Sequence, residues 1–325
     1  MRTSPLALVI GANGGIGREA SLALKRHGWQ VRALVRHLPT ERDGMEWVQG
    51  DAMQRADVLA AAKGADVIVH AVNPPGYKQW DKLVLPMLDN TIEAAKATGA
   101  RIVLPGTIYN FGPDAFPLLR EDSPQHPLTR KGEIRVEMER RLADAAHAGV
   151  RTLVLRCGDF FGPHAGNNWL SQGLLSVGKP VKTVRYPAQY THSHAWAYLP
   201  DVAETMVRLL EREQDLSTFD AFNFGGYWLD GHAMADAIRH ATGNPRIALR
   251  HFPWWLITLF APFVETLRET RKMRYLWKTS LRLDDTKLVA FLGGKPYTPL
   301  DQALRTTLTG LGCMEIDQLQ HKAAL

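Results

Sequence analysis

The segment LALVIGANGGIG, residues 6–17, restricts the possible folds more than any other part of the chain. An apolar run ends in a glycine-rich turn, which leads directly into residues with helical spacing. In this setting Gly11 permits a tight turn, Gly14 lets the backbone approach a pyrophosphate, and Gly17 lets the helix pack closely on the strand. The free N–H groups at the start of the helix favour a negatively charged ligand. The motif therefore predicts a dinucleotide site at the beginning of an α/β fold.

Strands and helices alternate along the first half of the chain. Short apolar runs predict buried strands, and apolar residues three or four apart predict helices. The expected strands are residues 6–12, 30–36, 45–51, 65–72, 101–106 and 150–156, and the expected helices are residues 14–27, 56–63, 80–98, 133–148 and 200–212. This alternation predicts an α/β protein of the Rossmann class, with a doubly wound parallel sheet and helices on both faces.

The alternation weakens after Gly158, where aromatic residues, prolines and histidines become more frequent. We therefore expect a cofactor-binding Rossmann domain over residues 1–158. Residues 159–325 would form mainly a smaller substrate lobe, with residues 198–230 returning to the Rossmann domain, so that the two parts interleave. The lobe should cover the carboxyl ends of the strands, where folds of this class bind ligands.

Composition limits the kinds of partner that the protein is expected to bind and the cellular compartment in which it is expected. The net charge is +6 at pH 7, and the chain has no run of lysine and arginine with interleaved aromatics that would indicate nucleic-acid binding. The longest apolar stretch, residues 252–267, contains Pro262 and is shorter than the ~20 residues that span a bilayer. Two cysteines, Cys157 and Cys313, provide neither a disulfide framework nor a metal cluster. We expect a cytoplasmic protein without stable membrane insertion.

The residues that follow the second, third and fourth strands are expected to contact the cofactor. Arg36 follows the second strand, where an acidic residue would bind the ribose 2′-hydroxyl of NAD and a cation suits the 2′-phosphate of NADP. NADP is therefore favoured over NAD, and Asp51 is positioned to bond the adenine amine. The expected cofactor-binding residues are Gly11, Asn13, Gly14, Gly15, Ile16, Gly17, Arg36, Asp51, Ala52, Ala71, Val72 and Asn73.

Five short segments occur in an order that resembles a known family. They are GANGGIG near the start, GD at residues 50–51, YNFG at 109–112, LRCGDFFGP at 155–163 and YLPDVAETM at 198–206. Together they resemble the extended or atypical short-chain dehydrogenase/reductases, in the NAD-dependent epimerase/dehydratase branch. The VRALVR strand is also similar to that of NADP-binding NmrA-like members. The resemblance reaches to about residue 230, and it implies a nicotinamide cofactor and a homodimer.

The catalytic pair usual in this family is replaced. Members usually carry a serine or threonine after the fifth strand and Tyr-x-x-x-Lys on the next helix, where the tyrosine transfers a proton. Here Lys131 falls at the tyrosine position and Arg135 at the lysine position. A shift of four residues would place Pro127 at the tyrosine position, so neither alignment restores the acid. The usual serine position holds Pro105, and Thr107 is the nearest hydroxyl.

We expect the catalytic groups to be Tyr109, Lys131, Thr107 and Arg135. Tyr109 lies just past the fifth strand, at the ligand-binding edge of the sheet, and is the first candidate for the proton donor. Lys131 is a second candidate acid if a neighbouring cation such as Arg135 lowers its pKa. Thr107 would orient a carbonyl group. The structural alternative is a packed loop aromatic at residue 109 and a solvated helix face around Lys131.

The residues after the sixth strand supply candidates for substrate contacts. These are Phe160, Asn167, Tyr186, His192 and His194. Although His-x-His can indicate a metal, no third ligand lies near it in sequence, and we expect no metal site. The aromatic stretch around Trp254 has four interpretations: ordinary core packing, an apolar pocket, a dimer face or a membrane-surface contact.

These observations favour an NADP(H)-dependent oxidoreductase that moves hydride to or from a carbonyl, alcohol or activated alkene. Its substrate would be a small organic molecule, and the aromatic content favours a bulky apolar one. The replaced catalytic pair also fits an NADP-binding redox-sensing regulator without turnover. A sugar-nucleotide epimerase or dehydratase and a membrane-surface or quinone-associated assembly factor are further alternatives.

Overall fold

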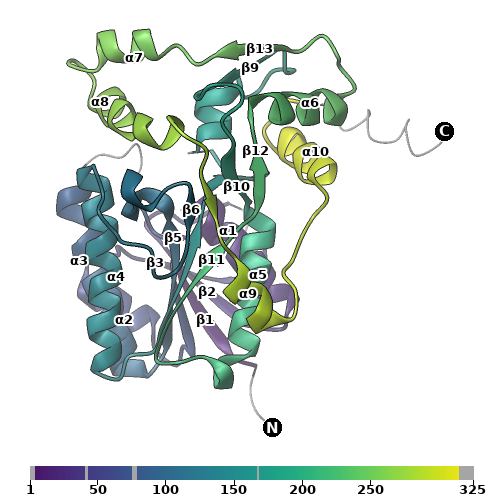
Figure 1. The fold of residues 1–325 in the computed structure, drawn as a ribbon. Coiled ribbons are helices and arrows are strands. Elements are labelled where there is room, and N and C mark those ends of the chain that lie inside the picture. The colour runs from purple at the N-terminus through teal and green to yellow at the C-terminus, as the bar shows by residue number, and fades with distance from the viewer. Residues whose placement is uncertain (1–3, 41–42, 75–78, 167, 315–325) are drawn as a thin grey trace.

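The computed structural model describes residues 4–40, 43–74, 79–166 and 168–314. It consists of a parallel sheet with helices on both faces and a smaller lobe that lies across the carboxyl ends of the strands (Figure 1). The described helices include none that is both long enough and apolar enough to cross a bilayer.

Seven parallel strands form the central sheet, in the order β11-β7-β5-β4-β1-β2-β3. Their bounds are β1 (Leu6–Ile10), β2 (Gln30–Val35), β3 (Glu46–Gln49), β4 (Val67–His70), β5 (Arg101–Thr107), β7 (Thr152–Cys157) and β11 (Phe219–Phe224). The six predicted strands are confirmed, and their ends lie within two residues of the expected ones. The strand order reverses between β1 and β4, and ligands of such folds bind at the crevice above this point.

Five helices cover the two faces of the sheet. Helices α1 (Gly15–Arg26) and α5 (Leu199–Glu211) pack on one face, and α2 (Arg55–Ala61), α3 (Trp80–Thr98) and α4 (Arg130–His147) pack on the other. Each helix buries an apolar stripe, such as Ala20 and Leu24 of α1 or Met138 and Leu142 of α4. The prediction of a doubly wound parallel sheet is therefore confirmed.

Helix α4 begins at Arg130, three residues before the predicted start. The side-chain oxygen of Thr129 accepts a hydrogen bond from the backbone N–H of Gly132 at 3.1 Å. This N-cap satisfies one of the free N–H groups of the first turn, so the helix extends to the threonine. The early start places Lys131 on the first turn and Arg135 on the second.

The later chain returns to the central sheet twice. Helix α5 packs beside α1, and β11 pairs in parallel with β7 along its whole length. Helix α9 (Thr286–Leu292) then packs on β11, where the rings of Phe222 and Phe291 lie 5.1 Å apart. Two segments from beyond residue 158 thus complete one edge of the Rossmann sheet.

The smaller lobe is built from short strands and helices. Its strands are β8 (Asp159–Phe161), β10 (His194–Tyr198) and β12 (Tyr227–Leu229) in one sheet, β9 (Thr183–Tyr186) with β13 (Ala248–His251), and β6 (Leu118–Leu119) with β14 (Arg282–Leu283). Its helices are α6 (Gly231–Thr242), α7 (Trp254–Phe260), α8 (Glu265–Lys272) and α10 (Leu300–Gly310), with the short helix η6 (Met273–Trp277). Large aromatic side chains such as Trp196 and Tyr186 fill its core.

Candidate active site

The glycine turn joins β1, the loop after β4 and the start of α1. Gly11 has a φ of +89°, and a Cβ atom on it would lie 2.7 Å from the Cα of Val72. A Cβ atom on Gly17 would lie 2.3 Å from the carbonyl oxygen of Gly11. Both distances are too short for a side chain, so these glycines let three backbone segments meet. The first turn of α1 carries no acidic residue, as a site for a phosphate requires.

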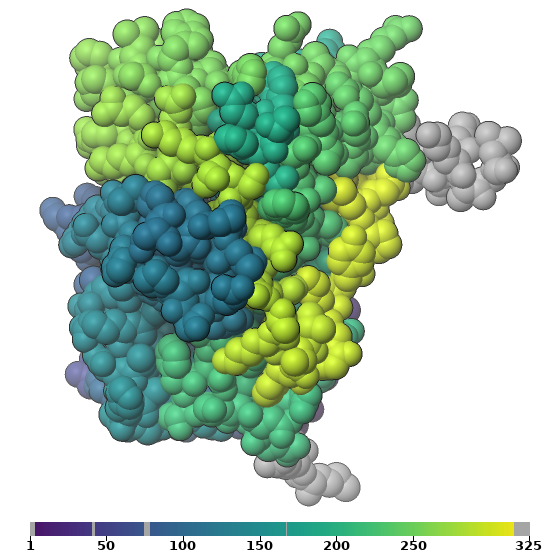
Figure 2. Space-filling model, viewed as in Figure 1, coloured from purple at the N-terminus to yellow at the C-terminus, as the bar shows by residue number. Residues whose placement is uncertain are grey.

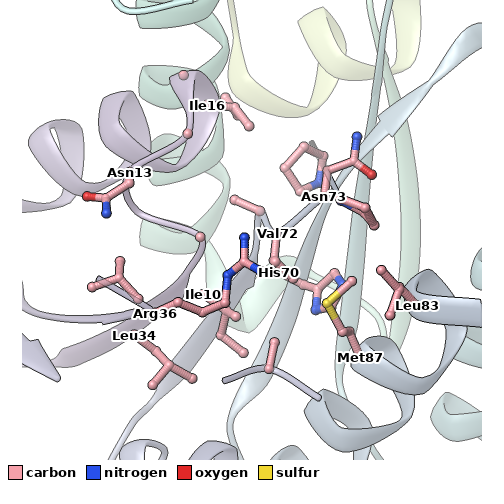
Figure 3. A pocket seen from close by; sticks show the side chains of 18 of the residues that line it. Ile10, Asn13, Ile16, Leu34, Arg36, His70, Val72, Asn73, Leu83 and Met87 are labelled. Atoms are coloured by element: carbon pink, nitrogen blue, oxygen red, sulfur yellow. The ribbon is translucent and has the colours of Figure 1, made fainter. Parts of the chain in front are cut away.

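A cavity of about 620 Å³ opens above the crevice between β1 and β4. Eleven of the twelve expected cofactor residues line it: Gly11, Asn13, Gly14, Gly15, Ile16, Arg36, Asp51, Ala52, Ala71, Val72 and Asn73. Gly17 lies behind the turn, packed against Gly11. Figure 3 shows side chains from β1, β2, β4 and α3 converging on this space. Its size and its bare glycine backbone fit a dinucleotide.

Arg36 and Asp51 line the cavity where the chain leaves β2 and β3. The side chain of Arg36 is exposed at the cavity and is labelled in Figure 3. The side-chain amide of Asn13 donates to the carbonyl oxygen of His37 at 3.1 Å, which ties the loop after β2 to the glycine turn. Oδ1 of Asp51 accepts from the backbone N–H of Met53 at 3.0 Å, which fixes the carboxylate at the end of β3.

A smaller cavity of about 100 Å³ adjoins the first one. Thr107, Tyr109 and Arg135 line it, and Thr107 and Arg135 also line the larger cavity. Thr107 ends β5 and caps the short helix η2 (Ile108–Asn110), because its hydroxyl oxygen accepts from the backbone N–H of Tyr109 at 3.3 Å. The structure thus brings together three of the four expected catalytic residues where the two cavities meet.

Lys131 is the expected catalytic residue that lines neither of these cavities. Its side chain is 5% exposed, and its Nζ lies 3.9 Å from Oε2 of Glu269 and 5.8 Å from the centre of the Trp80 ring. Burial lowers its pKa to about 8, and the charge of Lys272 adds to this effect while Glu269 opposes it. The neighbouring cation is therefore Lys272 of α8, not Arg135 as the sequence analysis supposed. The ion pair with Glu269 therefore links the ammonium group of α4 to α8.

Arg135 lies between the two cavities, beside a neutral histidine. Its guanidinium carbon is 5.1 Å from the centre of the Trp80 ring. His70, the last residue of β4, lines the larger cavity, and its Nδ1 lies 2.8 Å from the hydroxyl oxygen of Thr91. Burial, with a smaller contribution from the charge of Arg135, lowers the pKa of His70 to about 3, so the ring is neutral at pH 7. The sequence analysis missed His70, although its place directly before Ala71 was an available signal.

Asp159 is a second cavity residue that the sequence analysis missed. It lies on β8, lines the smaller cavity and is 7% exposed. Its Oδ2 lies 2.6 Å from Nε2 of His194 on β10, and the imidazole stacks on the ring of Trp277 with centroids 3.9 Å apart. A carboxylate directly after the sixth strand, at the ligand-binding edge, was the signal that would have identified it.

Of the residues expected to contact the substrate, one lines the cavities and others do not. Phe160 lines both cavities. Tyr186 is fully buried in the lobe, where its hydroxyl donates to the carbonyl oxygen of His192 at 2.9 Å. Like Tyr186, His192 and His194 line neither cavity. His194 is the first residue of β10 and is buried, whereas His192 lies before that strand and is half-buried. Asn167 lies outside the described residues. Among the residues described, no three His, Cys, Asp or Glu side chains gather as a metal ion would require.

Two curated proteins resemble parts of this chain. A 3-diazoavenalumate denitrifying reductase from Streptomyces sp is 33% identical over 177 residues, which cover 49% of this chain and 57% of that protein. A ceramide reductase from Caulobacter vibrioides (strain NA1000 / CB15N) is 33% identical over 103 residues, which cover 30% of this chain and 32% of that protein. The chain therefore matches about half of the length of the first and a third of the second.

Solved structures resemble the whole fold. A UDP-glucose-4-epimerase from Stenotrophomonas maltophila, with bound NAD and formylated UDP-arabinopyranose, aligns with a TM-score of 0.73 at 18% identity over 98% of this chain and 99% of that one. A UDP-N-acetylglucosamine 4-epimerase from Bacillus cereus aligns with a TM-score of 0.71 at 17% identity over 93% and 97% of the two chains. At these identities the likeness establishes the fold.

The sequence itself matches a family model over most of the Rossmann part. The match extends from residue 7 to residue 225, from β1 to the end of β11. It includes the glycine turn, the segments that line both cavities and the strand that completes the sheet. The chain belongs to the NAD dependent epimerase/dehydratase family.

Proposed function

We propose that this protein is an NADP(H)-dependent oxidoreductase of the atypical short-chain dehydrogenase/reductase type. It would move hydride to or from a carbonyl, alcohol or activated alkene of a small, bulky apolar substrate. The observation that carries the proposal is that the larger cavity, with its dinucleotide features, meets the smaller one at Thr107 and Arg135. A substrate in the smaller cavity would lie against the reactive end of a cofactor in the larger one.

The preference for NADP rests on the residue that follows β2. Arg36 lines the cavity at this position, where an acidic side chain would instead accept from the ribose hydroxyl of NAD. A guanidinium group can bind a 2′-phosphate through two parallel hydrogen bonds. The similar epimerase structure described above holds NAD, whereas we propose NADP for this protein. Whether the protein binds NADPH or NADH more tightly is therefore a direct test of the role of Arg36.

Tyr109 is the proposed proton donor. Bound NADPH would supply the hydride to the carbonyl carbon, while the Tyr109 hydroxyl protonates the carbonyl oxygen. Thr107 would hold that oxygen by a hydrogen bond. The positive charge of Arg135, which lines the same cavity, would stabilise the phenolate that remains until water returns the proton. In this proposal Tyr109, Thr107 and Arg135, which lie on neighbouring elements, take the place of the usual tyrosine and lysine.

The lining of the smaller cavity supports an aromatic or apolar substrate. Trp80, Phe160 and Trp169 contribute three aromatic side chains. The carboxylate of Asp159 would repel the diphosphate of a sugar nucleotide, which weakens the case for an epimerase or dehydratase. The names of the two curated relatives, a denitrifying reductase and a ceramide reductase, also support reduction.

The proposal is tested with the full-length protein, NADPH or NADH, and a panel of aromatic and long-chain aldehydes, ketones and enones. NADPH should bind more tightly than NADH, and at least one substrate should cause loss of the nicotinamide absorbance. Failure of both cofactors to bind would contradict the assignment of the larger cavity. NADPH binding without oxidation by any member of the panel would instead favour the regulator.

One observation favours the regulator as a second candidate. The position usual for the catalytic tyrosine holds Lys131, which is engaged by Glu269 outside both cavities. A regulator of this kind would bind NADPH tightly and change its affinity for a protein partner with the redox state of the cofactor. Pull-down of a discrete partner by the NADPH-loaded protein and not by the NADP⁺-loaded protein would support it.

We also propose that the protein is a cytoplasmic homodimer. The two buried, unpaired cysteines are compatible with a reducing compartment, and the dimer follows from the resemblance to the short-chain dehydrogenase/reductases. Light scattering of the purified protein at micromolar concentration would give the mass, and a monomer at every concentration would contradict the dimer.

A further inference from the structure

Large apolar side chains concentrate on one short segment of the lobe surface. Eleven large hydrophobic residues are exposed in the described chain, and five of them lie between residues 255 and 264. These five, which we call the α7 patch, are Trp255 (69% exposed), Leu259 (57%), Phe260 (48%), Phe263 (83%) and Val264 (43%). Since isolated exposed apolar residues are common but contiguous ones mark interaction sites, the patch needs a partner.

Helix α7 is fixed to the lobe by its opposite face. The indole N–H of Trp254 donates to the carbonyl oxygen of Pro187 at 2.7 Å, and its ring lies 5.9 Å from that of Trp169. Ala261, just beyond the helix, is 1% exposed. Trp255 and Leu259 are four residues apart and therefore project together from the outer face. The patch thus lies on the face of α7 away from Trp254, and α7 lies at the outer end of the lobe (Figures 1 and 2).

The sequence that contains the α7 patch is rich in positive charge. Residues 246–282 contain eight arginines and lysines and two glutamates, a net charge of +6, which equals the net charge of the whole chain. The basic side chains exposed in α8 and directly after it are Arg268, Arg271, Lys272, Arg274 and Lys278. The charges in the rest of the chain therefore balance, and α8, which follows the patch directly, carries part of the excess positive charge.

The combination of exposed apolar residues and basic residues indicates which kind of partner would bind here. An apolar ridge with a tryptophan, flanked by arginine and lysine, has the composition of segments that lie in the interface of anionic membranes. A second copy of the chain fits less well, because a two-fold interface would bring the same basic side chains from both copies against one another. We propose that the α7 patch and the basic residues of α8 dock this protein on the surface of an anionic phospholipid bilayer.

A chain of aromatic contacts connects the helix that carries the α7 patch to the candidate active site. The ring of Trp169 lines the smaller cavity and also contacts Phe252 and Trp254, with centroids 5.6 and 5.9 Å apart. Two aromatic side chains therefore separate the proposed membrane face from the proposed substrate site. If the proposed function holds, a bilayer-dissolved apolar substrate would reach the site from this side. The docking itself does not depend on that activity.

The test is co-sedimentation of the full-length protein with phospholipid vesicles. We expect binding to vesicles of phosphatidylcholine mixed with phosphatidylglycerol, much weaker binding to phosphatidylcholine alone, and weakening by salt. Phe263→Ser should reduce partitioning by about tenfold or more, since it removes one large apolar side chain that the membrane would bury. Arg268→Glu with Arg271→Glu should reduce it by a similar factor, at ~1 kcal/mol of attraction per basic residue.

Matched variants control for general effects of apolarity and charge. Leu128→Ser removes a comparably exposed apolar residue elsewhere, at 59% exposure, and Lys63→Glu with Lys82→Glu reverses two exposed charges on the Rossmann part. Both controls should bind vesicles like the wild type, and NADPH binding by every variant would show that its fold is intact. No binding to either vesicle, or equal losses in patch and control variants, would overturn the proposal. A dimer that Phe263→Ser dissociates, without vesicle binding, would assign the patch to a second copy instead.

Discussion

The carboxylate of Asp159, which lines the smaller cavity, lies 2.6 Å from the imidazole Nε2 of His194 behind it. Asp159 is 7% exposed and His194 is 1% exposed. The pair links β8, which follows the last central strand before the lobe, to β10 in the lobe. It therefore ties the lobe to a residue that lines the smaller cavity.

Asp159→Asn should lower the free energy of unfolding by about 1–3 kcal/mol at pH 7, because the buried imidazole loses a charged hydrogen-bond partner. Urea unfolding measures this. Asp114→Asn provides the control, since Asp114 pairs with His126 at 2.8 Å where both side chains are well exposed, and its change should stay below ~1 kcal/mol. Equal losses of unfolding free energy in the two variants would show that the buried pair stabilises the fold no more than the exposed pair.

Gly11→Ala should weaken NADPH binding by at least about tenfold and destabilise the protein, because its methyl group would collide with the backbone at Val72. Gly28→Ala is the control, because it places an alanine at a positive φ without the collision. Gly28 has a similar φ of +80°, but a Cβ atom there would meet nothing within 4 Å. That control should lose ~1 kcal/mol of stability and bind NADPH normally. Normal NADPH binding by Gly11→Ala would contradict the assignment of the turn.

Arg36→Ala should raise the Kd for NADPH by about 10- to 100-fold, the range expected for a lost charged hydrogen bond to a phosphate. The Kd for NADH should change little, since NADH lacks the 2′-phosphate. Fluorescence titration of both cofactors checks this, with Arg55→Ala on α2 as the control for loss of a surface arginine. A parallel loss of affinity for both cofactors would remove Arg36 from the 2′-phosphate site.

His70 should make the stability of the folded protein fall at acidic pH. Its folded-state pKa of about 3 lies below the ordinary 6.5, so the unfolded chain binds a proton that the folded protein rejects. This contribution destabilises the fold as pH falls from 6.5 toward 3, by up to about 1.4 kcal/mol per pH unit. His70→Leu should flatten the fall in urea stability between pH 6.5 and pH 4.5. His126→Leu, which changes a 75% exposed side chain, should keep the wild-type slope, and an unchanged slope in His70→Leu would refute the prediction.

The parallel sheet and the dinucleotide turn were predictable because their signals are local. An apolar run that ends in Gly11 and continues into a helix has few alternative folds, and each later predicted strand is again a short, largely apolar run. Eleven of the residues expected to bind the cofactor line one cavity for the same reason: the ends of parallel strands meet at one edge of a sheet.

The lobe and the fine geometry of the site depend on contacts between distant segments. Lys131 and Arg135 share a helix face, yet Glu269 and Lys272 of α8 surround Lys131 and leave Arg135 at the cavities. His194 resembles a surface histidine in sequence, but the pairing of β10 with β8 turns it onto Asp159. No local pattern encodes which strand β10 will pair with.

In the proposed reaction Tyr109 protonates a substrate held against the cofactor in the adjoining cavities. The most direct test is the rate of NADPH oxidation by Tyr109→Phe and Lys131→Ala with the best substrate of the panel. Tyr109→Phe should lower kcat by ~10²–10⁴-fold, the usual contribution of a general acid, while NADPH still binds. Lys131→Ala should stay within a few-fold of the wild type, since Lys131 lines neither cavity. The reverse pattern, with activity lost in Lys131→Ala and kept in Tyr109→Phe, would contradict it.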